Sequence, residues 1–332
     1  MADPAMRSAG TVSAFVTASV ATTACATEHS FHISIGGIAF TFQTCCETTM
    51  SGLRKHFGHL SGSSNNARIV TFFDAEHVHS QLPQITWNWT STTHRDEGGT
   101  AYFLDFQEAI LAHDTKEQRF VIATRAFTSQ DFSRREILRL LLQPVFSSVG
   151  LDVLHGATIG TENRCVLLAG PGGSGKSTLV AAAVHRGFYT VGEDFLVANG
   201  LDEHSDRKLV YSLFRTGKLV PSGPATSHFE SDGHAQDGKS IIFLDERRPA
   251  VVASQEVMAG VSIRQGPESS LRKTHWREFA GALLPYSAPL TYEPMRLAKH
   301  LSQVFRELPL YEVSSGPNIS ETLELLERLL ES

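Results

Sequence analysis

The chain has 332 residues and a hydrophobic content of 41%, which is enough to bury a substantial core and favours two domains over one. Its formal net charge of −6 provides no chain-wide basic field, so nucleic acid is not favoured as a partner. No apolar run is long enough for a transmembrane helix, and no membrane partner is expected. The 4 cysteines have neither zinc-type spacing nor a suitable disulfide framework, so we expect a reducing, cytoplasmic location.

Residues 1–30 are expected to form a disordered N-terminal tail. Residues 11–26 are rich in alanine, serine and threonine, and Arg7 is the basic residue that precedes them. A secretory signal peptide needs a positively charged start followed by a consistently apolar stretch. A disordered or wrongly assigned start is therefore favoured over a weak signal peptide.

Between residues 31 and 132, short alternating runs of apolar and polar residues predict a smaller, β-rich N-terminal domain of the α+β type. The expected strands are residues 31–35, 38–42, 85–89, 101–106 and 119–124. Turn signals such as Gly36-Gly37 separate these runs, which indicates a mainly antiparallel meander with exposed loops. One short helix is expected over residues 50–60.

Residues 133–332 are expected to form an α/β catalytic domain. A helix over residues 133–149 has a broad apolar face behind a capping box at Ser133 and Glu136, and would join the two domains. Further strands are expected at residues 151–159, 164–169, 188–191, 195–198, 209–214 and 241–244, and helices at 177–186 and 320–330. Strands that alternate with few helices indicate an α/β or α+β nucleotide-binding core. The polar residues 221–238, rich in glycine and proline, suit a mobile loop over its site.

A phosphate-binding loop is the most specific motif of the chain. It meets every position of the Walker A pattern GxxxxGK(S/T) with Gly170, Pro171, Gly172, Gly173, Ser174, Gly175, Lys176, Ser177 and Thr178. In such a P-loop, backbone N–H groups surround the β-phosphate, Lys176 reaches the β- and γ-oxygens, and the Ser177 hydroxyl ligates Mg²⁺. The strand predicted before the loop and the helix predicted after it are the context that the motif requires. The sequence therefore predicts binding of a nucleoside triphosphate such as ATP, together with Mg²⁺.

Two carboxylates, Glu193 and Asp194, follow the predicted strand at residues 188–191. Ligands bind at strand ends in sheets of this kind, so we expect both side chains near the γ-phosphate. Both are candidate metal ligands together with Ser177, and Asp194 is also the candidate base for an incoming hydroxyl. A solvated acidic turn is the alternative interpretation.

Residues 150–200 resemble the catalytic core of the HPr kinase/phosphorylase family. The similarity rests on His155-Gly156, the phosphate-binding loop, Arg186-Gly187 and the Glu193-Asp194 pair, in the order that the family shows. It implies a fold related to PEP carboxykinase, and transfer of the ATP γ-phosphate to a serine hydroxyl of a protein or peptide with Mg²⁺. By position, Asp194 matches the second acid of the family's Asp-Asp pair, Glu193 replaces the first, and His155 matches a catalytic strand histidine near the phosphates. The resemblance also allows a homo-oligomer.

Two departures from the family pattern limit what this resemblance implies. Glu193 is longer than the family's aspartate by one methylene group. A second family signature, a glutamate followed by Arg-Gly-x-Gly, is not evident, and the nearest stretch is residues 214–218. Phosphorylase activity and HPr as the substrate are therefore not implied. The chain is similar instead to a divergent branch found among peptide-tailoring genes, which includes kinases of lasso-peptide precursors.

Several assignments stay open at the level of the sequence. His155 is either a satisfied core histidine or a catalytic group. The following cations are either phosphate or substrate contacts or ordinary surface charges: Arg215, Lys218, Lys239, Arg247 and Arg248. Besides a protein or peptide kinase, the sequence is compatible with a small-molecule kinase and with a regulatory P-loop ATPase that hydrolyses without transfer. The choice between ATP and GTP is also open.

Overall fold

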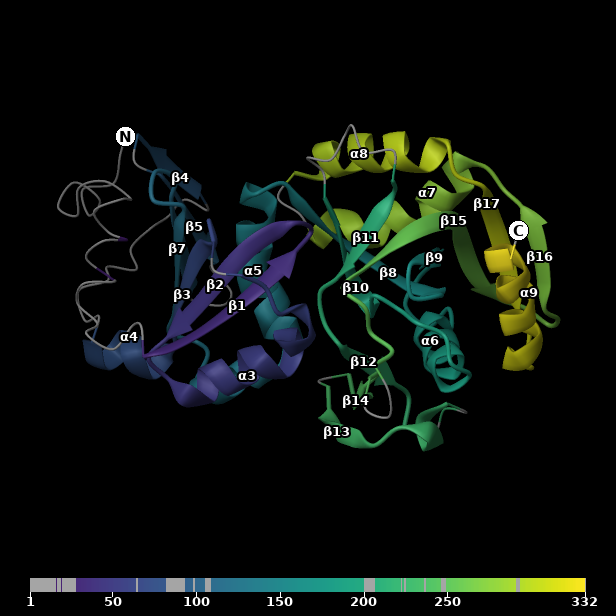
Figure 1. The fold of residues 1–332 in the computed structure, drawn as a ribbon, viewed down its shortest axis with the longest axis horizontal. Coiled ribbons are helices and arrows are strands. Elements are labelled where there is room, and N and C mark those ends of the chain that lie inside the picture. Colours follow the sequence, from purple (N-terminus) through teal and green to yellow (C-terminus); the bar gives the residue numbers. More distant parts are fainter. Residues whose placement is uncertain are drawn as a thin grey trace. The chain divides into compact units, whose positions relative to one another are not determined.

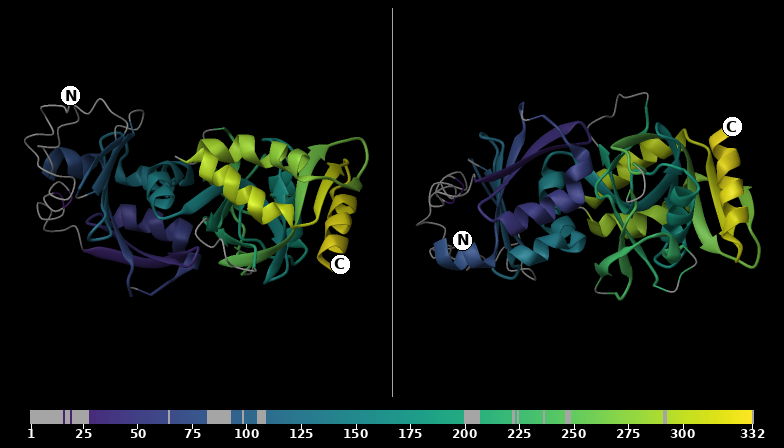
Figure 2. Two further views of the ribbon diagram at one scale, coloured as in Figure 1. Left: turned by 90° about the horizontal axis from the view of Figure 1, so that it is seen from above. Right: turned by 60° about the horizontal axis from the view of Figure 1, so that its bottom comes forward.

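The computed structural model describes most of the chain, and the described residues form a mixed α/β fold (Figures 1 and 2). They are residues 16, 19, 28–63, 65–81, 93–97, 99–104, 109–199, 207–221, 223, 225–235, 237–245, 249–290 and 293–331. Their contacts divide the chain into two compact units, residues 1–145 and 146–332. The predicted strand at 85–89 and nearly all of the predicted tail lie outside the described residues, and the predicted domain boundaries stay predictions. In the described part of the chain, no helix is long and apolar enough to cross a membrane.

The N-terminal unit is built on a seven-stranded sheet with the strand order β1-β2-β3-β7-β6-β5-β4. The strands are β1 (His29–Ile35), β2 (Ile38–Thr44), β3 (Arg68–Phe73), β4 (Thr93–Asp96), β5 (Gly99–Leu104), β6 (Ala109–Asp114) and β7 (Arg119–Thr124). Neighbours run antiparallel, except that β3 is parallel to both β2 and β7. The predicted meander is therefore wrong at β3, because the chain between β2 and β3 crosses over through helix α3 (Glu47–Phe57) and returns in the same direction.

Aromatic side chains pack α3 against this sheet. Phe42 of β2 contacts Phe57 of α3 and Phe72 of β3 edge to face, at ring-centroid distances of 5.3 and 5.5 Å. All three rings are fully buried. Helix α3 confirms the helix predicted over residues 50–60, although it begins at Glu47 and continues as a 3-10 turn, η1 (Gly58–Leu60). Strands β3, β4 and β6 and helix α4 (Ala75–Gln81) were not predicted.

Helix α5 (Arg135–Ser148) confirms the helix predicted over residues 133–149 but begins differently. A short 3-10 helix, η3 (Ser129–Ser133), precedes it, and a capping box is formed there by Thr128 and Asp131. The predicted capping box of Ser133 and Glu136 is therefore wrong, because Ser133 ends η3 instead of capping α5. The division between the two compact units falls within this helix.

The C-terminal unit contains a second seven-stranded sheet, in the order β11-β10-β8-β9-β15-β17-β16. Its strands are β8 (Leu151–Gly160), β9 (Arg164–Ala169), β10 (Glu193–Asn199), β11 (Leu209–Ser212), β15 (Ser254–Gln265), β16 (Ser270–Lys273) and β17 (Leu310–Ser315). Strands β9, β15 and β17 are parallel, and the other neighbours are antiparallel. The start of β15 also pairs with β11, which closes five strands into a ring. A separate sheet of three strands contains β12 (Thr216–Leu219), β13 (Ser231–His234) and β14 (Ser240–Phe243).

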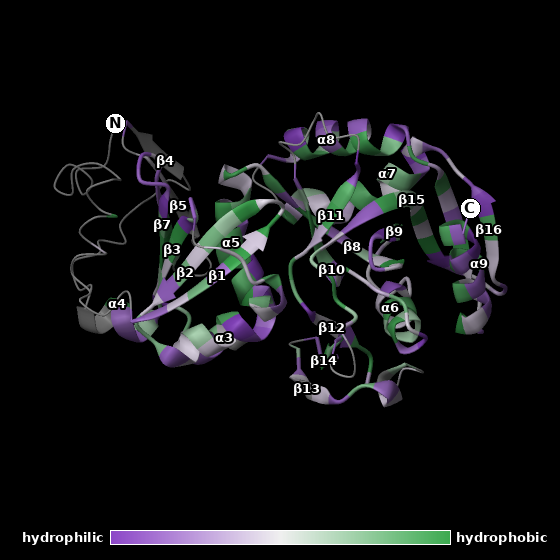
Figure 3. Cartoon of the chain, in the orientation of Figure 1, coloured by the Kyte–Doolittle hydropathy of each residue, from purple (hydrophilic) through white to green (hydrophobic). Residues whose placement is uncertain are grey.

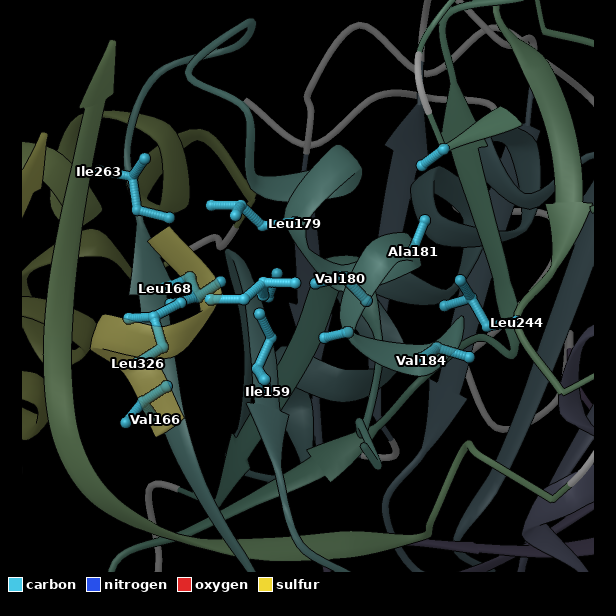
Figure 4. Close-up of a cluster of buried hydrophobic side chains, with 14 of the residues drawn as sticks. Ile159, Val166, Leu168, Leu179, Val180, Ala181, Val184, Leu244, Ile263 and Leu326 are labelled. Atoms are coloured by element: carbon cyan, nitrogen blue, oxygen red, sulfur yellow. The ribbon is translucent and has the colours of Figure 1, made fainter. Parts of the chain in front are cut away.

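Helices cover both faces of the larger C-terminal sheet, as the alternation of side chains along β9 shows. Val166 and Leu168 point into a core with α6 (Lys176–His185) and α9 (Ile319–Glu331), seen in Figure 4. Leu167, between them, belongs to the core formed with α7 (Trp276–Ser287) and α8 (Pro294–Arg306). Hydrophobic and hydrophilic residues alternate along α8 and α9 (Figure 3), as expected for helices with one covered face.

The predicted elements of this unit are confirmed in part. The predicted strands 151–159 and 164–169 correspond to β8 and β9, and the two predicted helices to α6 and α9. Residues 188–191 form two isolated bridges instead of the predicted strand, because the next strand begins only at Glu193. The predicted loop at 221–238 contains a 3-10 turn, η4 (Thr226–His228), and strand β13. Strands β12, β15, β16 and β17 and helices α7 and α8 were not predicted.

Candidate active site

The predicted P-loop connects the end of β9 to the start of α6, as its motif requires. Gly170 has a φ of 153°, and a Cβ built there would lie 2.8 Å from the Ile263 carbonyl oxygen. Gly175 precedes the first residue of α6 with a φ of 102°, in the left-handed region that glycine adopts without strain. The loop therefore depends on glycine at both ends, for lack of space at the first position and for its backbone conformation at the second.

Lys176 is buried within this loop, with 6% of the residue exposed. Its Nζ donates to the carbonyl oxygens of Gly170 and Pro171, at 2.7 and 3.1 Å. Burial lowers the pKa of the Lys176 ammonium, and the neighbouring carboxylates of Asp194 and Glu193 oppose this effect. The cation thus lies beside two acids in a site with little solvent, where electrostatic interactions are strong.

Glu193 lies directly against the P-loop. Its Oε1 accepts a hydrogen bond from the Ser177 hydroxyl, and its Oε2 accepts one from the backbone N–H of Lys218 at 3.1 Å. The residue is 3% exposed. A carboxylate and a hydroxyl are therefore held together at the position where the sequence predicts a metal ligand set.

Strand pairing places both acids level with the P-loop. Ala157 of β8 pairs with Leu168 of β9 on one side and with Glu193 of β10 on the other. Leu168 is the residue before the last one of β9, so β10 begins where β9 ends. The two acids were predicted to follow a strand at residues 188–191. They are instead the first residues of a strand, and β8 lies between that strand and β9.

Asp194 pairs with His155 of the neighbouring strand. His155 Nδ1 lies 3.1 Å from Asp194 Oδ1, and each side chain is 18% exposed. The His155 ring is flanked by Phe195 and Tyr286, with centroids at 6.3 and 5.8 Å. Its Nε2 is buried and has no hydrogen-bond partner among the described residues. His155 therefore belongs to the site and not to a separate apolar core.

A buried network fixes the turn that leads into the acidic pair. The Thr158 hydroxyl lies 3.0 Å from Gln255 Oε1 and accepts a hydrogen bond from the Val191 N–H at 2.9 Å. The Gly192 N–H donates to the Thr190 hydroxyl, also at 2.9 Å. The sequence did not indicate Thr158 or Gln255, because a threonine and a glutamine within strands carry no motif. Their contacts hold the backbone from which Glu193 and Asp194 extend.

His155, the two acids and most of the P-loop line one cavity of about 310 Å³. Its lining comprises His155, Gly172, Gly173, Gly175, Lys176, Ser177, Thr178, Glu193, Asp194, Lys218, Val220, Asp237, Lys239 and Gln265. Of the predicted loop residues, Gly170, Pro171 and Ser174 are not part of this lining. Three lining residues were not predicted, because they belong to no motif: Val220, Asp237 and Gln265.

The candidate cations differ in position. Lys218 and Lys239 line the cavity, and Lys239 Nζ lies 3.1 Å from the Asp237 carboxylate. Arg215 does not line it; its guanidinium lies 3.9 Å from Asp245 and 5.1 Å from the centre of the Phe243 ring. Arg247 and Arg248 lie outside the described residues.

The donor set fits Mg²⁺ bound together with phosphates. Among the described residues, no three histidine, cysteine, aspartate or glutamate side chains gather into a metal site. The site offers the oxygens of Ser177, Glu193 and Asp194. Mg²⁺ prefers oxygen ligands, and it usually takes one or two from carboxylates and the rest from phosphates and water. The residues present therefore suit Mg²⁺ better than a metal that needs a complete set of protein ligands.

The comparisons with known proteins assign no family to this chain. No family model matches the chain, and no curated protein matches it. Among solved structures, the chain is similar to the Hpr(Ser) kinase/phosphatase from Coxiella burnetii, with 15% sequence identity and a TM-score of 0.31. The match covers 53% of this chain and 96% of that one. A TM-score this low assigns neither a family nor an activity to the chain.

Proposed function

We propose that this chain is a Mg·ATP-dependent kinase that transfers the γ-phosphate to a serine hydroxyl of a protein or peptide. One observation carries the proposal: a P-loop and a His155–Asp194 pair line the same cavity. A P-loop alone is shared by motors, switches and kinases. A carboxylate at hydrogen-bond distance from a histidine, in the same cavity, adds a group that can accept a proton from an acceptor hydroxyl.

The P-loop and its neighbours would bind and orient the triphosphate. The backbone N–H groups at the start of α6 and the Lys176 ammonium would hold the β- and γ-phosphates. Ser177 and Glu193, already in contact, would hold Mg²⁺ with Asp194 nearby. When bound, Mg²⁺ neutralises charge on the β- and γ-phosphate oxygens. Lys218 and Lys239 would add positive charge to the same cavity.

Asp194 would act as the base. Its carboxylate accepts the proton of the acceptor hydroxyl as that oxygen forms a bond to the γ-phosphorus. The bond between the γ-phosphorus and the β–γ bridging oxygen breaks, and a nucleoside diphosphate leaves. His155 would be a positioning residue, since its Nδ1–H would donate to Asp194 Oδ1 and orient the carboxylate. Such positioning is most of what phosphoryl transfer requires from a protein.

The acceptor class rests on the sequence resemblance of residues 150–200. That resemblance implies a serine of a protein or peptide, and the divergent branch suggests a lasso-peptide precursor as the specific candidate. A metabolite hydroxyl and water are the competing acceptors, which correspond to a small-molecule kinase and to a regulatory ATPase. All three would use the same P-loop and Mg²⁺.

The test is transfer of label from γ-labelled ATP by the full chain with Mg²⁺. Three acceptor conditions are compared: the peptide encoded beside the gene, a metabolite panel, and neither. Labelled peptide serine that disappears in Asp194→Asn, but not in Asp245→Asn outside the cavity, is the expected result. Label in a metabolite, or released only as phosphate, would replace the peptide kinase with one of the two alternatives. No transfer and no hydrolysis under any condition would refute the proposal.

A further inference from the structure

A second and larger cavity, of about 510 Å³, adjoins the first. The two share Gly175, Thr178 and Gln265 in their linings. The second cavity is lined by the P-loop and the start of α6, by the turn after β15, and by the turn between β17 and α9. Its residues are Ser174, Gly175, Thr178, Leu179, Gln265, Gly266, Pro267, Ser315, Gly316, Pro317 and Ile319.

The two cavities differ in charge. The first contains the charged side chains that suit phosphates and a metal, including Lys176, Lys218 and Lys239. The second has no charged residue in its lining and presents Leu179, Pro267, Pro317 and Ile319. A nucleotide whose phosphates lie on the P-loop must place its sugar and base in adjoining space. The uncharged cavity is the one whose lining suits them, because ligand sites are mostly apolar with a few polar groups.

Polar groups along this cavity are already engaged with one another. The Gln265 side-chain amide donates to the Gly173 carbonyl oxygen at 2.9 Å, and the Gly266 N–H donates to the Ser315 carbonyl oxygen at 3.0 Å. The Gly316 N–H donates to the Ser269 hydroxyl at 3.3 Å. The two backbone N–H groups used in this way cannot also read the edge of a base, and Gln265 keeps one side-chain N–H and its Oε1 oxygen. A base would therefore be held mainly by contact with apolar surface.

Ser174 gives an independent indication of a ligand at this place. The residue is 5% exposed and lines the second cavity. Its hydroxyl has no hydrogen-bond partner among the described residues. A buried hydroxyl without a partner is costly, and a ligand oxygen next to the P-loop would supply the missing partner. The α-phosphate or the ribose of a nucleotide carries such oxygens.

We propose that the second cavity holds the nucleoside of the triphosphate, with the base between Pro267 and Pro317, and that it does not distinguish adenine from guanine. This inference rests on the proposed function, because it assumes that the P-loop binds a triphosphate. Proline rings offer apolar contact to either purine. A site without hydrogen bonds to the base edge lacks the strong discrimination that such bonds provide. The chain should therefore bind ATP and GTP alike.

Calorimetric titration of the full chain with Mg·ATP, Mg·GTP and Mg·tripolyphosphate tests this inference. We expect Kd values for ATP and GTP within about threefold of each other, and a Kd for tripolyphosphate at least about tenfold higher, since it lacks the nucleoside. A preference between ATP and GTP above about tenfold would overturn the absence of base recognition. Equal affinity for tripolyphosphate and ATP would overturn the nucleoside site. Failure of the folded chain to bind all three would refute the proposed function instead.

A double variant, Pro267→Ala with Pro317→Ala, locates the site. Both prolines are exposed and lie in turns, so we expect the variant to fold, as circular dichroism would check. The affinity for ATP and for GTP should fall by about threefold to tenfold, while that for tripolyphosphate stays unchanged. Pro294→Ala is the matched control, because Pro294 is exposed and lines neither cavity. An unchanged ATP affinity in the folded double variant would place the base elsewhere.

Discussion

Asp194 Oδ1 lies 3.1 Å from His155 Nδ1 across the pairing of β10 with β8. Asp194 has a φ of 79°, a backbone conformation that few residues other than glycine adopt and that aspartate and asparagine tolerate better than most. The conformation is held by the turn at residues 190–192, whose hydrogen bonds are buried. Strained backbone conformations cluster at functional sites, and this one lies in the lining of the cavity that contains the P-loop.

Asp194→Asn should nearly abolish phosphoryl transfer. Asparagine keeps the size and tolerates the same φ, but it cannot accept the proton, so kcat should fall by about 10²- to 10⁴-fold. The Kd for nucleotide without Mg²⁺ should change little, which calorimetry can check. Asp245→Asn is the control, since Asp245 does not line the cavity. A kcat within about threefold of wild type would remove Asp194 from the role of base.

Two substitutions of His155 separate positioning from packing. His155→Phe keeps an aromatic ring beside Phe195 and Tyr286 but loses the Nδ1–H donor to Asp194. We expect its kcat to fall by about tenfold to a hundredfold with KM for ATP nearly constant, because second contacts of this kind orient a catalytic group. His155→Asn restores an N–H donor at a similar position and should recover part of the loss. Equal activity of the two variants would contradict a positioning role.

Glu193→Asp should weaken the use of Mg²⁺. The longer side chain reaches both the Ser177 hydroxyl and the Lys218 N–H, and an aspartate is too short to keep both contacts. We expect the Mg²⁺ concentration for half-maximal activity to rise by about tenfold. Glu324→Asp, at an exposed position of α9, is the control. An unchanged Mg²⁺ requirement would show that aspartate and glutamate are interchangeable at position 193.

The link from β9 to α6 through residues 170–175 could be predicted from the sequence because the motif residues are contiguous and each has a local role. Glu193 and Asp194 were expected near that loop, but the strand register that brings them there could not be predicted. Their alignment with the loop depends on the pairing of Ala157 with both Leu168 and Glu193, and pairing between distant strands leaves no local pattern. The same reason explains the N-terminal sheet. Alternating residues predicted several of its strands, but not the parallel place of β3 (Arg68–Phe73) between β2 and β7.

Lys218 and Lys239 were candidate contacts from the sequence, but their place beside Asp237 in the cavity lining could not be predicted. Lys218 comes from β12, and Asp237 and Lys239 from the turn before β14. Strand β13, with the sequence Ser-Asp-Gly-His, has no apolar alternation and exists through pairing with β14. A polar segment of this kind is typical of a mobile loop when it is taken alone. In the structure, pairing with β14 makes β13 an edge strand of the three-stranded sheet.

Thr158→Val should destabilise the C-terminal unit. The Thr158 hydroxyl contacts Gln255 and accepts from the Val191 N–H in a fully buried place. Valine fills the same space but leaves those groups without their partner, which costs about 1–3 kcal/mol of unfolding free energy. Urea unfolding measures the loss. Thr48→Val, at an exposed position of α3, should change stability by less than about 0.5 kcal/mol. A loss equally small for Thr158→Val would show that water satisfies the network.

Lys176→Met should abolish nucleotide binding and yet stabilise the unliganded protein. Burial lowers the pKa of the Lys176 ammonium below its ordinary value of 10.5, so the folded protein bears a cost for the charge that methionine removes. At neutral pH the variant should gain unfolding free energy, as expected where a residue is kept for function at the expense of stability.

The stability that Lys176→Met gains over wild type should depend on pH. Between the lowered pKa of the folded state and 10.5, the unfolded chain binds more protons at Lys176 than the folded chain does. The contribution of Lys176 to wild-type stability therefore rises with pH in this window, and the advantage of Lys176→Met should shrink as pH approaches 10.5. Urea unfolding at a series of pH values measures the difference, with Lys273→Met at an exposed position of β16 as a control that should show no such trend. A variant less stable than wild type at neutral pH, or an advantage that grows with pH, would contradict the buried charge as the cause.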